Sequence, residues 1–266
     1  MSFRDLHQPG NPLVMLNVWD AGSARVMHRL GAQALATSSA ALAYTLGRPD
    51  GGTISREDSL THAQDIVAAT PLPVQGDFEN GFGDDPDTCA ETVRMAAEVG
   101  LAGICIEDTM FPSGNAYAFD LAVERMRAAS AAARALPGDF VLTARADGIL
   151  TGAYDTDEAI RRIVAFAAAG ADCLYAPLPP DMDALAQIVA ATDKPVNALV
   201  AGRFTKQSRA DFAAIRVARL SIGSSLARVT HRAIHDIGAA MIGGDFTGLK
   251  AGISSATIDA LLKDQS

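Results

Sequence analysis

The stretch PVQGDFENGFGDD, residues 73–85, decides the fold and the site that we predict for this chain. Its apolar start predicts a β-strand running into Asp77 and Glu79, and side chains two residues apart on a strand project to the same side. Gly81 and Gly83 then let the backbone turn sharply without the steric cost of a Cβ atom. Paired carboxylates at a strand end favour Mg²⁺, although an acidic, solvated turn has the same spacing.

Two later stretches repeat the arrangement and favour the metal site over the solvated turn. GICIEDT (103–109) predicts a strand that ends in Glu107 and Asp108. FVLTARADG (140–148) predicts another, which ends in Arg145 and Asp147. Charged side chains at three successive strand ends indicate one shared site.

Predicted strands and helices alternate along the whole chain. Each predicted strand is followed by a helix, and the strands are expected at 14–19, 34–39, 73–77, 102–106, 140–145, 173–177, 195–199 and 217–223. Eight such units predict an α/β fold, a single (β/α)8 TIM barrel over residues 1–266 with its active site at the strand C-termini. A helical extension is expected over about 224–266. A doubly wound open sheet is the alternative, but the glycine fingerprint after its first strand is missing.

Composition narrows the class of partner. The chain has 266 residues, of which 49% are hydrophobic, and its 22 Lys and Arg against 31 Asp and Glu give a formal charge of −9. This balance argues against nucleic acid or an anionic membrane surface as a partner. Cys89, Cys105 and Cys173 stand in apolar surroundings, without a signal peptide or a long apolar run. We therefore expect reduced thiols in a soluble, cytoplasmic protein.

The predicted strand ends place a group of polar and charged residues at the barrel mouth, namely Ser38, Ser39, Asp50, Asp77, Glu79, Glu107 and Arg145. Four acids around one point repel one another, and a divalent cation is the simple way to hold them ionised. Arg145 offers a bidentate grip on a substrate carboxylate, and the two serines add hydroxyl and backbone N–H donors. A cation beside a carboxylate-binding arginine suits a 2-oxo acid and favours an enolate.

The same residues resemble the isocitrate lyase/phosphoenolpyruvate mutase superfamily over about residues 12–240. The segments that carry the resemblance are SSAALAYTLGRPD (38–50), VQGDFENGFGD (74–84), GICIEDTMFPSGN (103–115) and TARADG (143–148). The resemblance implies a barrel that exchanges its eighth helix between subunits, in a homo-oligomer that is a dimer or a tetramer. It also implies Mg²⁺, or Mn²⁺, held by Asp77 with Glu79, Glu107 and Asp50 nearby, partly through water. Arg145 and the Ser38–Ser39 turn match the family's binders of substrate carboxylate.

The loop after the strand GICIE (103–107) departs from both known reaction types. In the lyases it carries K-[KR]-C-G-H, and here Asn115 stands at the position of the acid/base cysteine. In the phosphonomutases it reads F-P-K-T-N-S, whereas here Ser113 replaces the lysine and Ala116 the serine. The sequence therefore retains the shared enolate chemistry without either full acid/base set. Decarboxylation of a β-keto acid such as oxaloacetate needs no loop acid, and Tyr44 or a metal-bound water could supply the later proton.

These observations give three functional hypotheses. The first is a Mg²⁺-dependent lyase that cleaves a C–C bond in a small 2-oxo or 2-hydroxy di- or tricarboxylate, like 2-methylisocitrate lyase or oxaloacetate decarboxylase. The second is P–C bond chemistry, as in phosphoenolpyruvate mutase or phosphonopyruvate hydrolase, and the third is a non-catalytic 2-oxo acid-binding protein. We predict the following roles: catalytic Asp50, Arg145 and Asn115; substrate-binding Ser38, Ser39, Tyr44, Asp77, Arg145 and Asn197; metal-binding Asp77, Glu79 and Glu107.

Other candidates have simpler interpretations. His231 and His235 are four apart on the last long helix, but no third ligand is evident, and we interpret them as surface or packing histidines. SIGSSLA (221–227) could form a phosphate cup at the last strand–helix junction, but a serine helix cap is the preferred interpretation. Cys105 is expected to pack in the core, and Asp108 to face away from Glu107 in a structural role.

Overall fold

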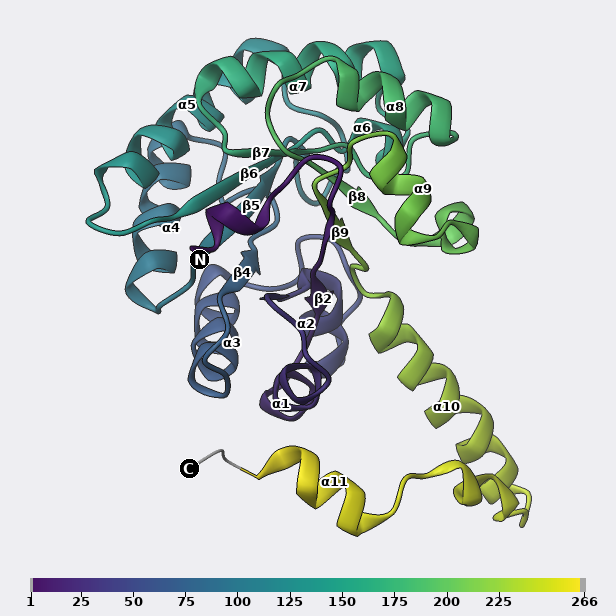
Figure 1. Cartoon of the computed structure of the whole chain (residues 1–266). Coiled ribbons are helices and arrows are strands. Elements are labelled where there is room, and N and C mark those ends of the chain that lie inside the picture. The colour runs from purple at the N-terminus through teal and green to yellow at the C-terminus, as the bar shows by residue number, and fades with distance from the viewer. Residues whose placement is uncertain (1, 264–266) are drawn as a thin grey trace.

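Parallel β-strands form a barrel that helices surround in the computed structural model, which describes residues 2–263 (Figure 1). The strands are β1 (Leu13–Val14), β2 (Leu16–Asn17), β3 (Leu35–Ala36), β4 (Val74–Asp77), β5 (Gly103–Glu107), β6 (Val141–Arg145), β7 (Cys173–Tyr175), β8 (Val196–Leu199) and β9 (Arg219–Ser221). Their order within the described residues is β1-β9-β8-β7-β6-β5-β4-β3-β2, and every neighbouring pair is parallel.

The barrel closes through its first strand, which is observed as two segments on either side of Met15. β1 pairs with β9, while β2 pairs with β3. The Met15 N–H still donates to the Leu220 carbonyl at 2.8 Å, so the change of partner occurs within one residue. A strand within a closed barrel has a neighbour on each side, and the first strand therefore pairs with both β9 and β3. The predicted barrel of parallel strands is confirmed, and the open doubly wound alternative is wrong because the sheet has no free edge at this strand.

The helices follow the strands along the chain. They are α1 (Ala21–Arg29), α2 (Ser39–Thr45), α3 (Arg56–Ala68), α4 (Pro86–Glu98), α5 (Phe119–Ala135), α6 (Gly148–Thr151), α7 (Thr156–Ala169), α8 (Met182–Ala190), α9 (Arg209–Ala214), α10 (Ser225–Ile242) and α11 (Ser255–Leu262), with 3-10 turns η1 (Arg4–Leu6), η2 (Gly202–Lys206) and η3 (Thr247–Ala251). Asp20 caps α1 and Ser55 caps α3, each in a reciprocal capping box. Within residues 2–263 no helix has both the length and the hydrophobicity needed to cross a bilayer.

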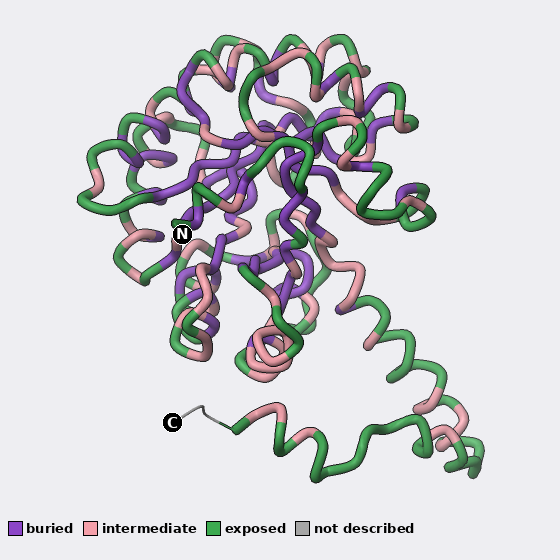
Figure 2. The backbone as a smooth tube through the Cα atoms, in the orientation of Figure 1, coloured by how far each residue is buried: buried purple, intermediate pink, exposed green. Residues whose placement is uncertain are grey.

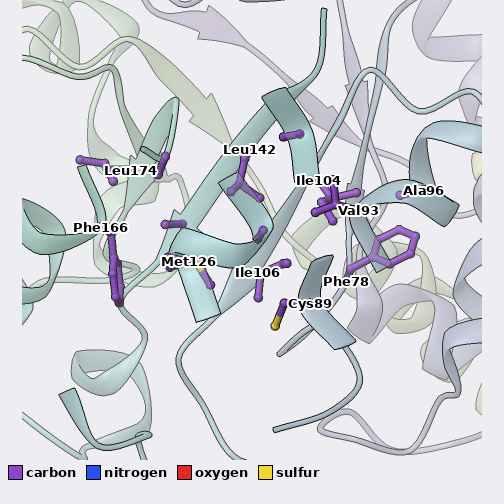
Figure 3. Packing of buried hydrophobic residues seen from close by; sticks show 14 of the residues in the cluster. Phe78, Cys89, Val93, Ala96, Ile104, Ile106, Met126, Leu142, Phe166 and Leu174 are labelled. Carbon is purple, nitrogen blue, oxygen red and sulfur yellow. The ribbon is translucent and has the colours of Figure 1, made fainter. Parts of the chain in front are cut away.

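The main core lies between the outer faces of the strands and the helices. Figure 3 shows Ile104 and Ile106 of β5 with Leu142 of β6 and Val93 of α4, all fully buried. Gly76 belongs to this packing, because a Cβ atom there would lie 2.3 Å from the Phe78 ring. The apolar side chains of the strands face outward into this layer, and the strand faces that point into the barrel are free to carry polar residues.

The last long helix does not cover the barrel. α10 projects away from it, and η3 and α11 lead the chain back past α1 (Figure 1). Arg25 of α1 donates to the Leu262 carbonyl of α11 at 2.9 Å. Ala227 is the buried residue of α10, whereas Ile234 is 68% exposed and Ile242 92% exposed (Figure 2). The exchange of this helix between subunits stays a prediction.

Candidate active site at the barrel mouth

A cavity of about 270 Å³ opens at the C-terminal ends of the strands. Most of the residues that the sequence predicts for the site line it, namely Ser38, Ser39, Asp50, Asp77, Glu79, Glu107 and Arg145, and Asp147 joins them. They come from β4, β5, β6 and the segments after β3, which end side by side around the barrel. Parallel pairing brings these distant residues together, as the strand-end argument predicts.

Arg145 is the electrostatic centre of this mouth. Its guanidinium contacts Asp77 Oδ1 at 2.9 Å and Glu107 Oε2 at 2.9 Å. It also grips Asp147 bidentately, with Nε–Oδ1 at 3.0 Å and Nη2–Oδ2 at 2.5 Å. Burial acts to lower the pKa of Arg145, but the three carboxylates outweigh it and raise that pKa well above its usual value. One planar cation therefore holds three acids in a fixed arrangement.

The β3–α2 junction orients Asp77 from the opposite side. Asp77 Oδ2 accepts hydrogen bonds from both the backbone N–H and the hydroxyl of Ser39, each at 2.9 Å. Its own backbone N–H donates to Thr37 Oγ1 at 2.8 Å. Ser38 caps α2, with its hydroxyl oxygen accepting from the Ala41 N–H at 3.3 Å. The two serines therefore stand at the mouth beside the central carboxylate.

Glu79 is held in a conformation that side chains rarely adopt. Its φ of 43° lies in the left-handed region, and the Gly52 N–H donates to its Oε1 at 3.1 Å. The residue is 4% exposed, and burial, with Asp77 and Asp50 nearby, raises the pKa of its carboxyl to about 7. Burial and Asp77 also raise the pKa of Asp50. Gly81, at φ 81°, belongs to the turn that follows Glu79. The Glu79 carboxylate thus lies in a mouth that already contains other acids.

The donor set fits a divalent cation. Burial, before any other cause, raises the pKa of both Glu107 and Asp147, so these acids are costly to ionise without further positive charge. Among residues 2–263 no three His, Cys, Asp or Glu side chains already converge on one point as a complete ligand set. Mg²⁺ suits such a mouth, because it keeps several waters and is commonly bound through one or two carboxylates. The residues that would hold it are Asp77, Glu79, Glu107 and Asp50.

Comparison with known proteins identifies the family. The phosphoenolpyruvate phosphomutase family profile matches residues 3–242. The chain belongs to the phosphoenolpyruvate mutase/isocitrate lyase superfamily. A crystal structure of a candidate lyase/mutase from Burkholderia cenocepacia J2315 is 43% identical, with a TM-score of 0.93 over 97% of this chain and 93% of that one. An uncharacterized protein of Mycobacterium tuberculosis (strain H37Rv) is 36% identical over 84% of this chain and 82% of its own length.

Enzymes with defined reactions also belong to this superfamily. Oxaloacetate decarboxylase of Chromohalobacter salexigens is 30% identical over 81% of this chain and 75% of its own length. An oxaloacetate acetylhydrolase solved with the inhibitor 3,3-difluorooxaloacetate is 25% identical, with a TM-score of 0.87 over 98% of this chain and 92% of that one. A phosphonopyruvate hydrolase solved with oxalate and Mg²⁺ shares the fold at 22% identity, with a TM-score of 0.85 over 98% of this chain and 95% of that one. The solved relatives thus include one with an oxaloacetate analogue bound and one with oxalate and Mg²⁺ bound.

Three of the predicted site residues lie outside the cavity. Asn115 is exposed in the loop after β5, where its carbonyl accepts from the Met110 N–H at 2.7 Å. Tyr44 packs edge-on against His231 of α10, with ring centroids 5.6 Å apart. Asn197 is fully buried and donates to the Ser221 hydroxyl at 2.9 Å. The roles predicted for Asn115, Tyr44 and Asn197 remain predictions.

The simpler interpretations of two other residues agree with the geometry. Asp108 lies behind the site, where it accepts from the Asp147 N–H, the Tyr154 hydroxyl and Arg162, each at 2.8 Å. It therefore supports the segment after β6. Cys105 is buried beside Asp77 on the neighbouring strand, where its thiol lines the cavity and donates to Asp77 Oδ1 at 3.4 Å, and burial raises the pKa of the thiol. A neutral thiol in this position is a packing group.

The candidate phosphate cup and the histidine pair do not form sites of their own among the described residues. The backbone N–H groups of Ile222 and Gly223 both donate to Asn17 Oδ1 at 2.9 Å, so they are already used. Ser224 occupies the cap position of α10 but makes no side-chain cap hydrogen bond, so the predicted capping contact is wrong. His235 contacts Asp236 on the exposed surface of the helix, as expected of a surface histidine.

A buried polar layer lies beneath the mouth and was not predicted from the sequence. Gln75, Thr143 and Arg219 are buried and point into the barrel, and Gln75 and Arg219 line the cavity. Gln75 and Thr143 stand two residues before Asp77 and Arg145 on the same strands. Two sequence features could have indicated this layer, namely the two-residue spacing and the lone arginine in the strand sequence VARLS.

The raised pKa of Glu79 predicts a pH-dependent stability. Its carboxyl goes from an ordinary pKa of 4.5 to about 7 in the folded protein, so folding without metal retains a proton that the unfolded chain releases. The contribution of Glu79 therefore lowers the free energy of unfolding as the pH rises from about 4.5 to about 7. Glu79→Gln should remove this pH dependence. The gain in free energy of unfolding that the substitution gives the metal-free protein should be about 2 kcal/mol larger at pH 8 than at pH 5. Urea denaturation of both proteins in EDTA at the two pH values measures it, and an equal effect at both would contradict it.

Proposed function

We propose that the protein is a Mg²⁺-dependent lyase that cleaves a C–C bond in a small 2-oxo or 2-hydroxy di- or tricarboxylate through an enolate, with an oxaloacetate-like 2-oxo diacid as the best fit. The observation that carries this proposal is the mouth itself, where Asp77 and Glu107 share Arg145. Its excess of acids suits a divalent cation, and its arginine suits a carboxylate. The superfamily includes both C–C lyases and P–C bond enzymes, and the features below favour the former.

The loop between β5 and α5 favours decarboxylation among C–C cleavages. Asp108, the first residue of this loop, is not among the residues that line the cavity and pairs with Arg162 behind the site, and residues 109–118 contain no Cys, His, Lys, Asp or Glu. Tyr117 is buried, and its hydroxyl donates a hydrogen bond to Asp84 at 2.5 Å. Burial and the contact with Asp84 raise the pKa of this hydroxyl. No side chain of this loop therefore exchanges protons near neutral pH. Loss of CO₂ from a β-keto acid is the C–C cleavage that needs least from such a loop.

The residues of the mouth account for the steps of that reaction. Arg145 and the Ser38–Ser39 turn bind and orient the carboxylate next to the keto group. Bound Mg²⁺ would supply positive charge beside the keto oxygen. The bond to the distal carboxylate breaks, its electron pair enters the enolate, and that carboxylate leaves as CO₂. A proton from water then gives the shorter 2-oxo acid, and Phe111 and Leu150, which line the cavity, limit the entry of other water.

A second candidate is P–C bond chemistry of the phosphonopyruvate type. The observation in its favour is that the loop retains Phe111, Pro112 and Asn115 of the phosphonomutase pattern, with Phe111 at the cavity. The missing lysine at Ser113 weakens it, because a transferred phosphoryl group needs compensating positive charge. A third candidate is a protein that binds a 2-oxo acid and does not turn it over.

We also propose a homo-oligomer, dimer or tetramer, in which residues 224–263, the described part of the predicted extension, pack on another copy. Val229 and Ile234 of α10 are more than 60% exposed, and Phe246 and Leu249 follow them at 59% and 57%. Exposed apolar side chains on a projecting helix and on the segment that follows it are typical of an interface.

The test of the proposed function is a substrate panel. Oxaloacetate, 2-methylisocitrate, isocitrate and phosphonopyruvate are each incubated with the protein in Mg²⁺ and in EDTA. We expect Mg²⁺-dependent loss of oxaloacetate or another 2-oxo or 2-hydroxy acid. Phosphate release from phosphonopyruvate would favour the second candidate instead. Binding of a 2-oxo acid without any turnover would favour the third.

Asn115 should affect binding more than chemistry. Its amide can hydrogen-bond a substrate after loop movement but cannot exchange protons at neutral pH. Asn115→Ala should therefore weaken substrate binding by about 1–3 kcal/mol and leave kcat within about tenfold. The measurement is kcat and KM against pH, with Ser113→Ala in the same turn as control. A thousandfold fall in kcat at unchanged KM would place Asn115 in the chemistry and contradict this prediction.

A further inference from the structure

Arg219 lies at the floor of the cavity, beneath the acidic mouth. Its side chain is 1% exposed, and β9 directs it into the barrel interior. Nη1 donates to Gln75 Oε1 at 2.6 Å and to Thr143 Oγ1 at 3.3 Å, and Nε donates to Asn197 Oδ1 at 2.9 Å. These hydrogen bonds fix the plane of the guanidinium.

The partners of this buried cation are neutral. Among residues 2–263 no Asp or Glu forms an ion pair with Arg219. The remaining partner is His7 Nε2 at 3.2 Å, which must accept, because His7 Nδ1 donates to the Phe3 carbonyl at 3.0 Å. Burial and Arg219 lower the pKa of His7 to about 3, so it carries no charge at neutral pH. A buried charge that meets only neutral groups is costly.

One edge of the guanidinium is available to a ligand. Nη2 donates to no group within the described residues, although Nε and Nη1 are both engaged. It is also not among the buried polar atoms left without a partner, which for residues 2–263 are Ser59 Oγ, Arg125 Nε and Ser130 Oγ. An unbonded atom outside that set retains solvent access, and the open space next to Arg219 is the cavity.

The two arginines of the cavity stand one layer apart. Arg145 contacts Asp77, and Arg219 contacts Gln75, which is two residues earlier on the same strand. Two strand residues span about 7 Å, so the positions on β4 that the two arginines contact are roughly that far apart. The carboxylates of a four-carbon diacid can contact two guanidinium groups at this separation at once.

We propose that Arg219 Nη2 binds the second carboxylate of the substrate at the floor of the cavity and so selects diacids over monoacids. The proposal rests on the proposed function, because it assigns Arg145 to the first carboxylate. Arg219 then acts as a specificity-determining residue for binding, and the substrate carboxylate supplies the counter-charge that the protein does not until that carboxylate leaves as CO₂. Gln75 and Asn197 are the neutral groups that hold its fork in place.

A matched pair of probes tests the proposal. 3,3-Difluorooxaloacetate and 3,3-difluoropyruvate differ in the distal carboxylate, and calorimetry in Mg²⁺ gives a Kd for each. In the unaltered protein the diacid should bind more tightly. Arg219→Met should raise the Kd of the diacid by about 30-fold or more, because a buried charged contact is lost. It should raise the Kd of the monoacid by less than about threefold. If that variant does not fold, Arg219→Gln is measured in its place with the same expectation.

The control is His7→Ala, which loosens the same hydrogen-bond network from the side away from the cavity. It should lower the melting temperature and leave the ratio of the two Kd values unchanged. An equal loss for both probes in the Arg219 variant would overturn the role of Arg219 and leave the proposed function standing. Binding of neither probe to the unaltered protein would overturn both.

Discussion

Asp77→Asn should lower kcat/KM by at least about 1,000-fold and abolish Mg²⁺ binding, because this carboxylate is the predicted direct ligand of the ion. It contacts Arg145 on one side and Ser39 on the other, so it stands at the centre of the mouth. The fold should survive, since Glu107 and Asp147 still pair with Arg145 and one repelling charge is gone.

The measurements for Asp77 are turnover, calorimetric Mg²⁺ titration and thermal melting in EDTA. Asp183→Asn, on the exposed first turn of α8, makes the same chemical change away from the site and should leave all three unchanged. Normal turnover in the Asp77 variant, or full activity of the unaltered protein in EDTA, would contradict the metal assignment.

Arg145→Lys should lower kcat/KM by about 100-fold or more for any carboxylate substrate. A lysine keeps the charge but loses the planar fork that reaches Asp77, Glu107 and Asp147 together. Losing a charged contact of this kind typically costs about 2–5 kcal/mol when its partner is buried. Arg161→Lys, at an exposed ion pair with Glu158, is the matched control. An effect below about twofold would show that Arg145 only holds its neighbouring acids in place.

The barrel and the centre of the site could be predicted because both depend on repeated local patterns. Asp77, Glu107 and Arg145 each end an apolar strand, and parallel strands bring such ends to one mouth. The split of the first strand at Met15 could not be predicted, because it arises from closure of the sheet.

The residues that periodicity does not place were harder to predict. Asn115 lies in a loop whose path depends on tertiary contacts, and Tyr44 turns away to meet α10. Asp147 lies just beyond the end of β6, and its grip on Arg145 follows from the turn into α6. Arg219 was missed because its neighbours Gln75 and Asn197 come from distant strands, and only the register of the barrel brings them together.

The central claim is Mg²⁺-dependent cleavage of a C–C bond in a 2-oxo acid at this mouth. The most direct measurement is ¹³C NMR of uniformly labelled oxaloacetate incubated with the protein in Mg²⁺, in EDTA and with the Asp77→Asn variant, which corrects for decarboxylation by free Mg²⁺. We predict enzyme-dependent, EDTA-sensitive formation of labelled pyruvate and CO₂, absent in the variant. Unchanged oxaloacetate, or products that form equally with the variant or in EDTA, would contradict the claim.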